Sequence, residues 1–241
     1  MTRPPAEHSI VVRRTFVAAV AAGLLWCAQG PIWVLAPKVQ ATVPPYQVTH
    51  RALFLAVWLS VDAAVLFSAL ALRGLASIGV GNTGRTGRVT TRIAALAAAL
   101  AGVATAATAT AGLGIAEDQA LAVLPLALDL GGFTLLVAVI LVAVRPNTLR
   151  RVLPRRSRFL PAVLAGLTFL TLVAVASSGT HATIGLILAV VTVDLSGAAW
   201  MALGWMVQRA PAHRSRQRER GIRAAAADRP GGSGQRPTPR R

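Results

Sequence analysis

The sequence predicts an all-α, polytopic integral membrane protein with six transmembrane helices arranged as three consecutive hairpins. Of its 241 residues, 54% are hydrophobic and only 14% are charged, and the mean hydropathy is +0.59. An ordinary soluble domain has roughly 25% charged residues, so this composition excludes a soluble globular enzyme. Six apolar segments are each long enough to cross a bilayer, which takes about 20 helical residues. Most of the arginines lie between these segments.

The six apolar segments follow one another in pairs. A single span must satisfy its own backbone hydrogen bonds in lipid, and the α-helix does so. The segments cover residues 16–36, 52–72, 93–115, 120–144, 159–177 and 183–207. We therefore predict hairpins at about 16–72, 93–144 and 159–207, related by a threefold pseudo-repeat.

Local sequence justifies each segment in turn. The first contains Gln29-Gly30-Pro31, and proline removes a helical hydrogen bond, so we expect an interruption there. The second follows a polar connection at 37–51, and the third and fourth are separated by an acidic turn at Glu117. The fifth begins after Arg158, and the sixth runs to Arg209.

Basic residues predict the orientation, because cationic loops resist translocation across the membrane. Arginines cluster on one side, whereas Lys38 and Arg51 are the basic residues of the other. Both termini are therefore predicted to be cytoplasmic. Residues 1–15 form a short cytoplasmic segment, 16–207 the bundle, and 208–241 a disordered basic tail. This tail either attracts anionic lipid head groups or serves only as a topology anchor.

Other functional classes find little support in the sequence. The net charge of +17, from 25 basic and 8 acidic residues, does not indicate nucleic-acid binding, because the basic residues flank apolar runs. The glycines of 79–84 match a dinucleotide-binding pattern, but no strand and no downstream acidic residue accompany them. One cysteine, Cys27, excludes a cysteine cage for zinc. We predict no enzyme activity, metal or cofactor.

Three aspartates form the most informative pattern. Asp62, Asp129 and Asp194 are spaced 67 and 65 residues apart, one in the second helix of each predicted hairpin. Their helices run from outside to inside, which places each carboxyl about 14–17 Å below the outer edge, near the bilayer centre. A charged residue at this depth is costly and usually faces a bundle interior or a wet cavity. Three carboxyls at one depth could converge and share a proton or bind a cation.

Small and hydroxylic residues lie at compatible positions around these aspartates. Gly132 and Gly197 follow Asp129 and Asp194 by three residues, so each shares a helix face with its aspartate and leaves room there. Further oxygen ligands could come from hydroxyl pairs on the third and fifth segments, namely Thr105 with Thr108 and Thr168 with Thr171.

Two functions follow from this pattern. The first is proton- or cation-linked movement of a small solute through the intramembrane aspartates. The second is a non-catalytic membrane scaffold or accessory subunit, in which protonated aspartates only hold helices together and the chain binds lipid, another protein or a second copy of itself. Alanine- and arginine-rich composition indicates a GC-rich bacterium, so we expect the cytoplasmic membrane.

Overall fold

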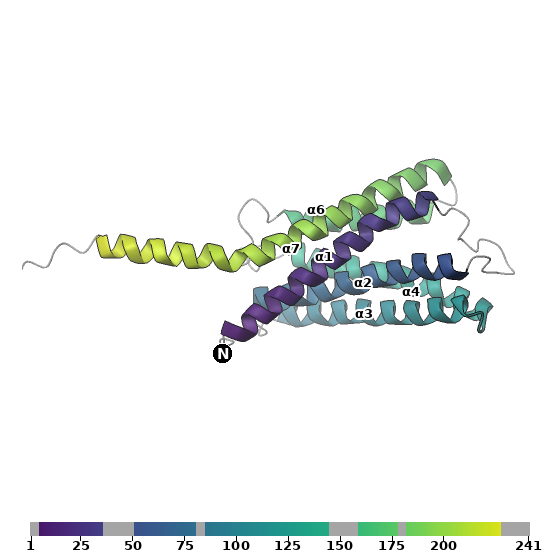
Figure 1. Cartoon of the computed structure of the whole chain (residues 1–241), viewed down its shortest axis with the longest axis horizontal. Helices are drawn as coiled ribbons and strands as arrows, with labels where there is room; N and C mark the ends of the chain where they lie inside the picture. Colours follow the sequence, from purple (N-terminus) through teal and green to yellow (C-terminus); the bar gives the residue numbers. More distant parts are fainter. Residues whose placement is uncertain (1–4, 36–50, 81–84, 145–158, 178–181, 228–241) are drawn as a thin grey trace, which may run out of the picture. The chain divides into compact units, whose positions relative to one another are not determined.

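The described chain is entirely helical. The computed structural model describes residues 5–35, 51–80, 85–144, 159–177 and 182–227. Within these ranges there are six helices and no strand, which confirms the all-α prediction (Figure 1). The helices are α1 (Pro5–Leu35), α2 (Arg51–Val80), α3 (Arg85–Gly112), α4 (Glu117–Ala143), α6 (Leu160–Ser177) and α7 (Ala182–Ala227).

Five of these helices are long and apolar enough to cross a membrane. Their spans are Ser9–Ile32, Arg51–Ile78, Gly87–Gly112, Glu117–Ala143 and Ile187–Arg209. The fifth predicted segment, 159–177, is helical as α6, but its described apolar part, Leu160–Ala174, is shorter than the five candidate spans. The structure therefore has the helices of a multi-pass membrane protein.

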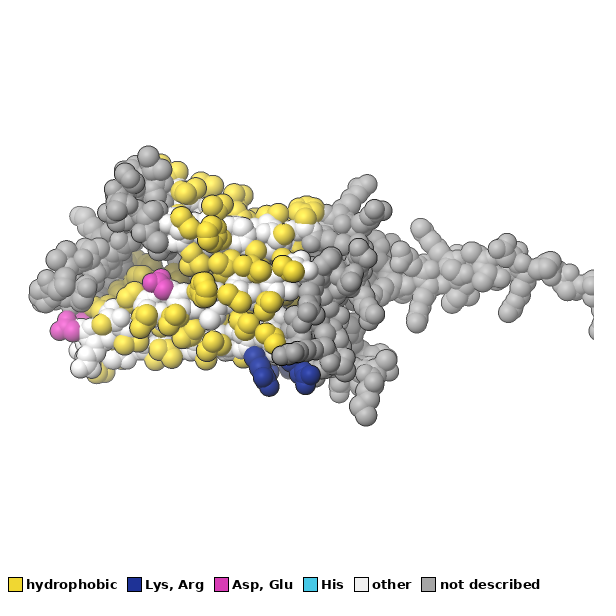
Figure 2. Space-filling model, turned by 180° about the vertical axis from the view of Figure 1, so that it is seen from behind, with side chains coloured by type: hydrophobic (Ala, Val, Ile, Leu, Met, Phe, Trp, Pro, Cys, Tyr) yellow, Lys and Arg dark blue, Asp and Glu magenta, His cyan; other side chains and the backbone are white. Residues whose placement is uncertain are grey.

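Small side chains are frequent inside the described bundle, and many large apolar side chains lie on its surface. Alanine dominates the buried core, as at Ala22, Ala97 and Ala104, each at most 1% exposed. Large apolar side chains such as Leu126 and Phe169 are instead more than half exposed. Hydrophobic side chains cover much of the described face in Figure 2, with basic and acidic side chains toward opposite ends. Small residues inside and large apolar residues outside suit a bundle that is surrounded by lipid.

Neighbouring helices run in opposite directions. On α1 and α2, Trp26 Nε1 donates to Ser68 Oγ at 3.1 Å, whereas Gln29, further along α1, bonds an earlier residue of α2, Ser60. Helix α3 pairs with α2 in the same antiparallel manner and meets α4 at a tight turn. At that turn Gly114 has a φ of +73°, which favours glycine.

The first and last helices approach each other closely. A methyl group added at Gly23 of α1 would lie 2.6 Å from the Gly197 carbonyl oxygen of α7, and one added at Gly197 would lie 2.6 Å from the Gly23 carbonyl oxygen. Gly204 of α7 packs against Ala19 of α1, so this pair is also antiparallel. Glycine on both helices lets their backbones come into contact.

Two expectations differ from the structure. Helix α1 continues through Pro31 to Leu35 instead of breaking, because α2 and α7 pack against the Gln29-Gly30 segment and hold it in place. The expected disorder of 208–241 is not seen for 208–227, where α7 remains helical. Arginine, glutamine, glutamate and alanine in this stretch are all good helix formers. Residues 228–241 lie outside the described residues.

The chain divides into two compact units, Met1–Gln208 and Arg209–Arg241. The first unit contains the whole apolar bundle. The second contains the C-terminal part of α7, whose side chains beyond Arg209 are not among those described. The lipid-binding expectation for the basic tail therefore remains a prediction.

Substituting Gly23 with leucine should separate α1 from α7. The added side chain meets the Gly197 backbone, which cannot rotate away, so overpacking should cost about 1–3 kcal/mol of unfolding free energy. Gly102→Leu on α3 is the matched control, because a side chain there meets nothing within 4 Å. Unfolding by sodium dodecyl sulfate in mixed micelles measures both variants, and equal stability of the two would contradict the close crossing.

Candidate functional site

Asp62 is a buried carboxyl between α2 and α3. It is 1% exposed and lies within the span Arg51–Ile78. The Thr108 hydroxyl of α3 donates to Asp62 Oδ2 at 3.0 Å, while Asp62 Oδ1 has no hydrogen-bond partner. Thr105 also lies within hydrogen-bonding reach of Asp62, although its hydroxyl donates to the Ala101 carbonyl at 2.9 Å. Of the two hydroxyls expected here, Thr108 therefore makes the direct bond.

Gln29 of α1 brings a second buried polar group to α2. Its side chain is 0% exposed, and Nε2 donates to Ser60 Oγ at 2.8 Å and to the Leu25 carbonyl at 3.4 Å. Gln29 Oε1 accepts no hydrogen bond. The sequence predicts for this residue only a place in a helix interruption. The signal that could have found it is an amide within an apolar helix, followed by glycine and proline.

Asp194 is a carboxyl between α7 and α1. A methyl group added at Gly30 would lie 2.6 Å from Asp194 Oδ1, so only glycine at that position leaves space for the carboxyl. Cys27 Sγ donates to the Asp194 main-chain carbonyl at 3.5 Å, and Asp194 Oδ1 is buried without a partner. Gly197 also contacts α1, so Asp194 and Gly197 share a helix face as their spacing predicts.

Asp62 is a buried carboxyl and Asp194 a half-buried one, and both lack a charged partner among the described residues. In the described part of the chain neither forms an ion pair, whereas the acid Glu117 lies 4.0 Å from Arg51 near the ends of their helices. An uncompensated carboxylate within the membrane is costly, and the low dielectric strengthens its attraction for any positive charge. A bound proton or cation would remove this cost, which makes both carboxyls chemically suited to binding one.

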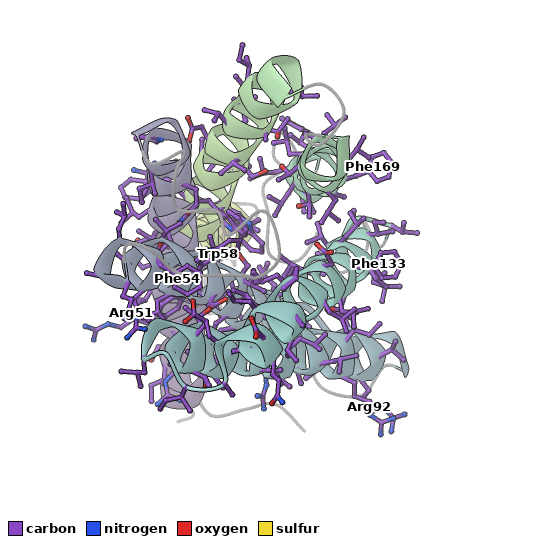
Figure 3. The ribbon with its side chains drawn as sticks, turned by 90° about the vertical axis from the view of Figure 1, so that its right-hand side faces the viewer. Arg51, Phe54, Trp58, Arg92, Phe133 and Phe169 are labelled. Carbon is purple, nitrogen blue, oxygen red and sulfur yellow. The ribbon has the colours of Figure 1, made fainter. Side chains whose placement is uncertain are left out.

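Asp129 lies in a different environment from the other two aspartates. Its side chain is exposed on α4, and Phe133, one turn later and 57% exposed, points outward (Figure 3). Among the described residues, no three histidine, cysteine or acidic side chains come together as a group that could hold a metal ion. The structure thus places two aspartates at helix interfaces and the third on the surface of the bundle.

Three of the predicted supporting residues line a cavity. Gly132 of α4 and Thr168 and Thr171 of α6 line it, together with Ser196 and Trp200 of α7. None of the three aspartates lines this cavity. Ser196 is not among the predicted site residues, although it lies between Asp194 and Gly197, which are.

Thr108→Val should weaken the α2–α3 interface. The substitution removes the donor to Asp62 and should cost about 0.6 kcal/mol of unfolding free energy, and at most about 2 kcal/mol, as for other interhelical hydrogen bonds in membranes. Thr110→Val on the same helix is the control, because that hydroxyl bonds the Ala106 carbonyl of its own helix. Detergent-mediated unfolding compares the two variants. A smaller loss for Thr108→Val than for Thr110→Val would contradict the assigned bond.

Comparison with known proteins identifies no family for this chain. No protein-family model matches it, and no curated protein or solved structure matches it either. Its function is therefore argued from the chemistry of its own residues.

Proposed function

We propose that this chain is a multi-pass protein of a bacterial cytoplasmic membrane that binds a proton or cation at Asp62 and Asp194. Binding and release at these carboxyls are linked to movement of a small solute. Asp129, on the surface of the bundle, is left out of this site. The observation that carries the proposal is Asp62, which is 1% exposed within a span and has an unpartnered oxygen.

Unpartnered acceptors on three adjacent helices support this proposal. Gln29 Oε1, Asp62 Oδ1 and Asp194 Oδ1 belong to α1, α2 and α7, and each is buried without a donor. A buried acceptor left unpaired costs about 1–3 kcal/mol. A bound proton, a water molecule or a cation would each give these oxygens the partner that they lack. A purely structural bundle would gain stability by replacing such groups with apolar ones.

Helix directions support six crossings with both termini on one side of the membrane, and the arginine distribution predicts that this side is the cytoplasm. Helix α7 is antiparallel to α1, and α4 is antiparallel to α3. Because α1, α2, α3 and α4 alternate in direction, α4 and α7 run the same way. The chain must therefore cross back between them, and α6 lies in that part of the sequence. We propose that α6 and its flanking residues form the sixth span.

Infrared difference spectroscopy tests proton binding without knowledge of the solute. In the purified chain in lipid vesicles, we expect a carboxyl band that changes reversibly with pH and is lost in Asp62→Asn. Asp194→Asn should remove a second contribution. Replacing the bath cation at fixed pH then distinguishes a cation site from a proton site, because only a cation site shifts the carboxylate bands.

Asp118→Asn is the matched control for this experiment. Asp118 is an exposed acid in the first turn of α4, so its loss should leave the intramembrane bands unchanged. A spectrum in which Asp62 stays protonated at every accessible pH, and does not respond to cations, would contradict the proposal. Asp62 and Thr108 would then act only to hold α2 and α3 together.

A second candidate function is favoured by the exposed position of Asp129. An acidic residue on the outer face of a transmembrane helix is costly against lipid, and that cost falls when another protein chain covers it. Exposed Leu126, Leu130 and Phe133 surround it along α4. On this basis the chain is a scaffold or accessory subunit that contacts another membrane protein, or a second copy of itself, through this face.

Cysteine cross-linking in native membranes tests this second function. With Cys27 replaced by alanine, Leu126→Cys should form a cross-linked species, because Leu126 is 61% exposed and one turn from Asp129. Adding Asp129→Leu should reduce the yield of the cross-linked species, because a leucine side chain is stable against lipid and does not favour contact with another chain at this face. Val103→Cys, 48% exposed on α3, is the control position. Equal cross-linking at both positions, unaffected by Asp129→Leu, would contradict an interface at this face.

A further inference from the structure

The cavity that contains Gly132 is separate from the proposed carboxyl site. It is bounded by five helices, α1, α2, α4, α6 and α7, and measures about 50 Å³ as space open to the centre of a water molecule. One water needs only about 10–15 Å³ by this measure, so the cavity has room for a larger molecule. Its walls are mainly apolar, and none of its described lining residues is ionisable. Such a wall selects against charged ligands.

Two tryptophans give the cavity flat, apolar walls. Trp26 Nε1 already donates to Ser68 Oγ at 3.1 Å, so the polar edge of that ring is occupied within the bundle. Trp200 is 1% exposed. Aromatic rings provide large contact areas for the hydrocarbon part of a ligand.

Three hydroxyl-bearing residues, Thr168 and Thr171 of α6 and Ser196 of α7, contribute to the wall of this apolar space. Thr168 and Thr171 donate to the Leu164 and Leu167 carbonyls at 2.8 and 2.9 Å, so their oxygens can only accept a further bond. The Ser196 side chain is 6% exposed, and its Oγ is buried with no partner. Because two of these groups are acceptors only, a ligand that matches them must carry a hydrogen-bond donor.

We propose that this cavity binds a neutral molecule with a short hydrocarbon body and one hydroxyl group. The hydrocarbon contacts Trp26 and Trp200, while the ligand hydroxyl donates to Thr168 or Thr171 and accepts from Ser196. In the complex, the Ser196 hydroxyl forms with the ligand the hydrogen bond that it otherwise lacks. This site is independent of proton or cation binding at Asp62.

Quenching of tryptophan fluorescence by bromohexanol tests the proposal in the full chain in lipid vesicles. Bromine quenches an indole that it contacts, so binding should appear as saturable quenching. Ser196→Ala should weaken bromohexanol binding several-fold, because the hydroxyl of the ligand loses the Ser196 hydroxyl as a hydrogen-bond partner. Trp200→Phe should reduce the quenching amplitude, which assigns the signal to this cavity.

Two glycine variants provide a matched pair for the same measurement. Gly132→Leu should abolish saturable quenching by filling the cavity, and the atom that it meets first is the flexible end of Leu172 at 3.0 Å. Gly166→Leu on α6 should behave as the native chain, since nothing lies within 4 Å of a side chain added there. Circular dichroism checks that both variants fold. If Gly132→Leu does not fold, Ser196→Ala provides the test of the site.

Bromohexane, which lacks the hydroxyl, separates this site from a hollow that any lipid chain fills. Binding of bromohexanol but not bromohexane supports the proposal. Equal binding of bromohexanol and bromohexane would overturn the proposed role of the Thr168, Thr171 and Ser196 hydroxyls. Quenching that never saturates, or that is the same in the native chain and in Gly132→Leu, would overturn the site itself and leave water as its occupant.

Discussion

The architecture of this bundle depends on how closely its helices approach one another. Lipid tails are as apolar as leucine, so burying large side chains between helices gives little drive for association. Contact between helices must come instead from small residues that let backbones meet. Alanine is the commonest residue of the described core, and Gly23 and Gly197 bring α1 and α7 into backbone contact. This crossing closes the first helix of the bundle onto the last.

Close packing determines what the polar side chains can do. Three interhelical hydrogen bonds end on α2, at Ser60, Asp62 and Ser68, so this helix collects the polar contacts of its neighbours. A buried polar group that lacks a partner in the bilayer cannot form a hydrogen bond with bulk water instead. The oxygens of Gln29, Asp62, Asp194 and Ser196 that remain unpaired are therefore where a proton, an ion or a ligand has most to contribute.

The sequence led to part of the candidate site and missed the rest. Spacing predicted that Asp194 and Gly197 share a face, and both contact α1. It also paired a hydroxyl of the third segment with an aspartate, and Thr108 bonds Asp62. Periodicity could not show that Asp129 would face outward, because its helix is apolar on every side and has no marked polar stripe. The hydroxyls of Thr168 and Thr171 lie at the cavity with Ser196, away from the aspartates.

By itself the sequence determined the fold class, since segments of about 20 apolar residues in lipid must be helical to satisfy their own backbone groups. It also determined that carboxyls lie within those segments. Only the tertiary structure decided which helices touch, that α1 continues through Pro31, and which carboxyls are buried. The reason is physical: the apolar surfaces of these helices are nearly equivalent to one another. Two kinds of contact select which helices pair: glycines that let backbones approach each other, and hydroxyl groups that form hydrogen bonds between helices. The residues in these contacts lie far apart in the chain, so no local sequence pattern reveals them.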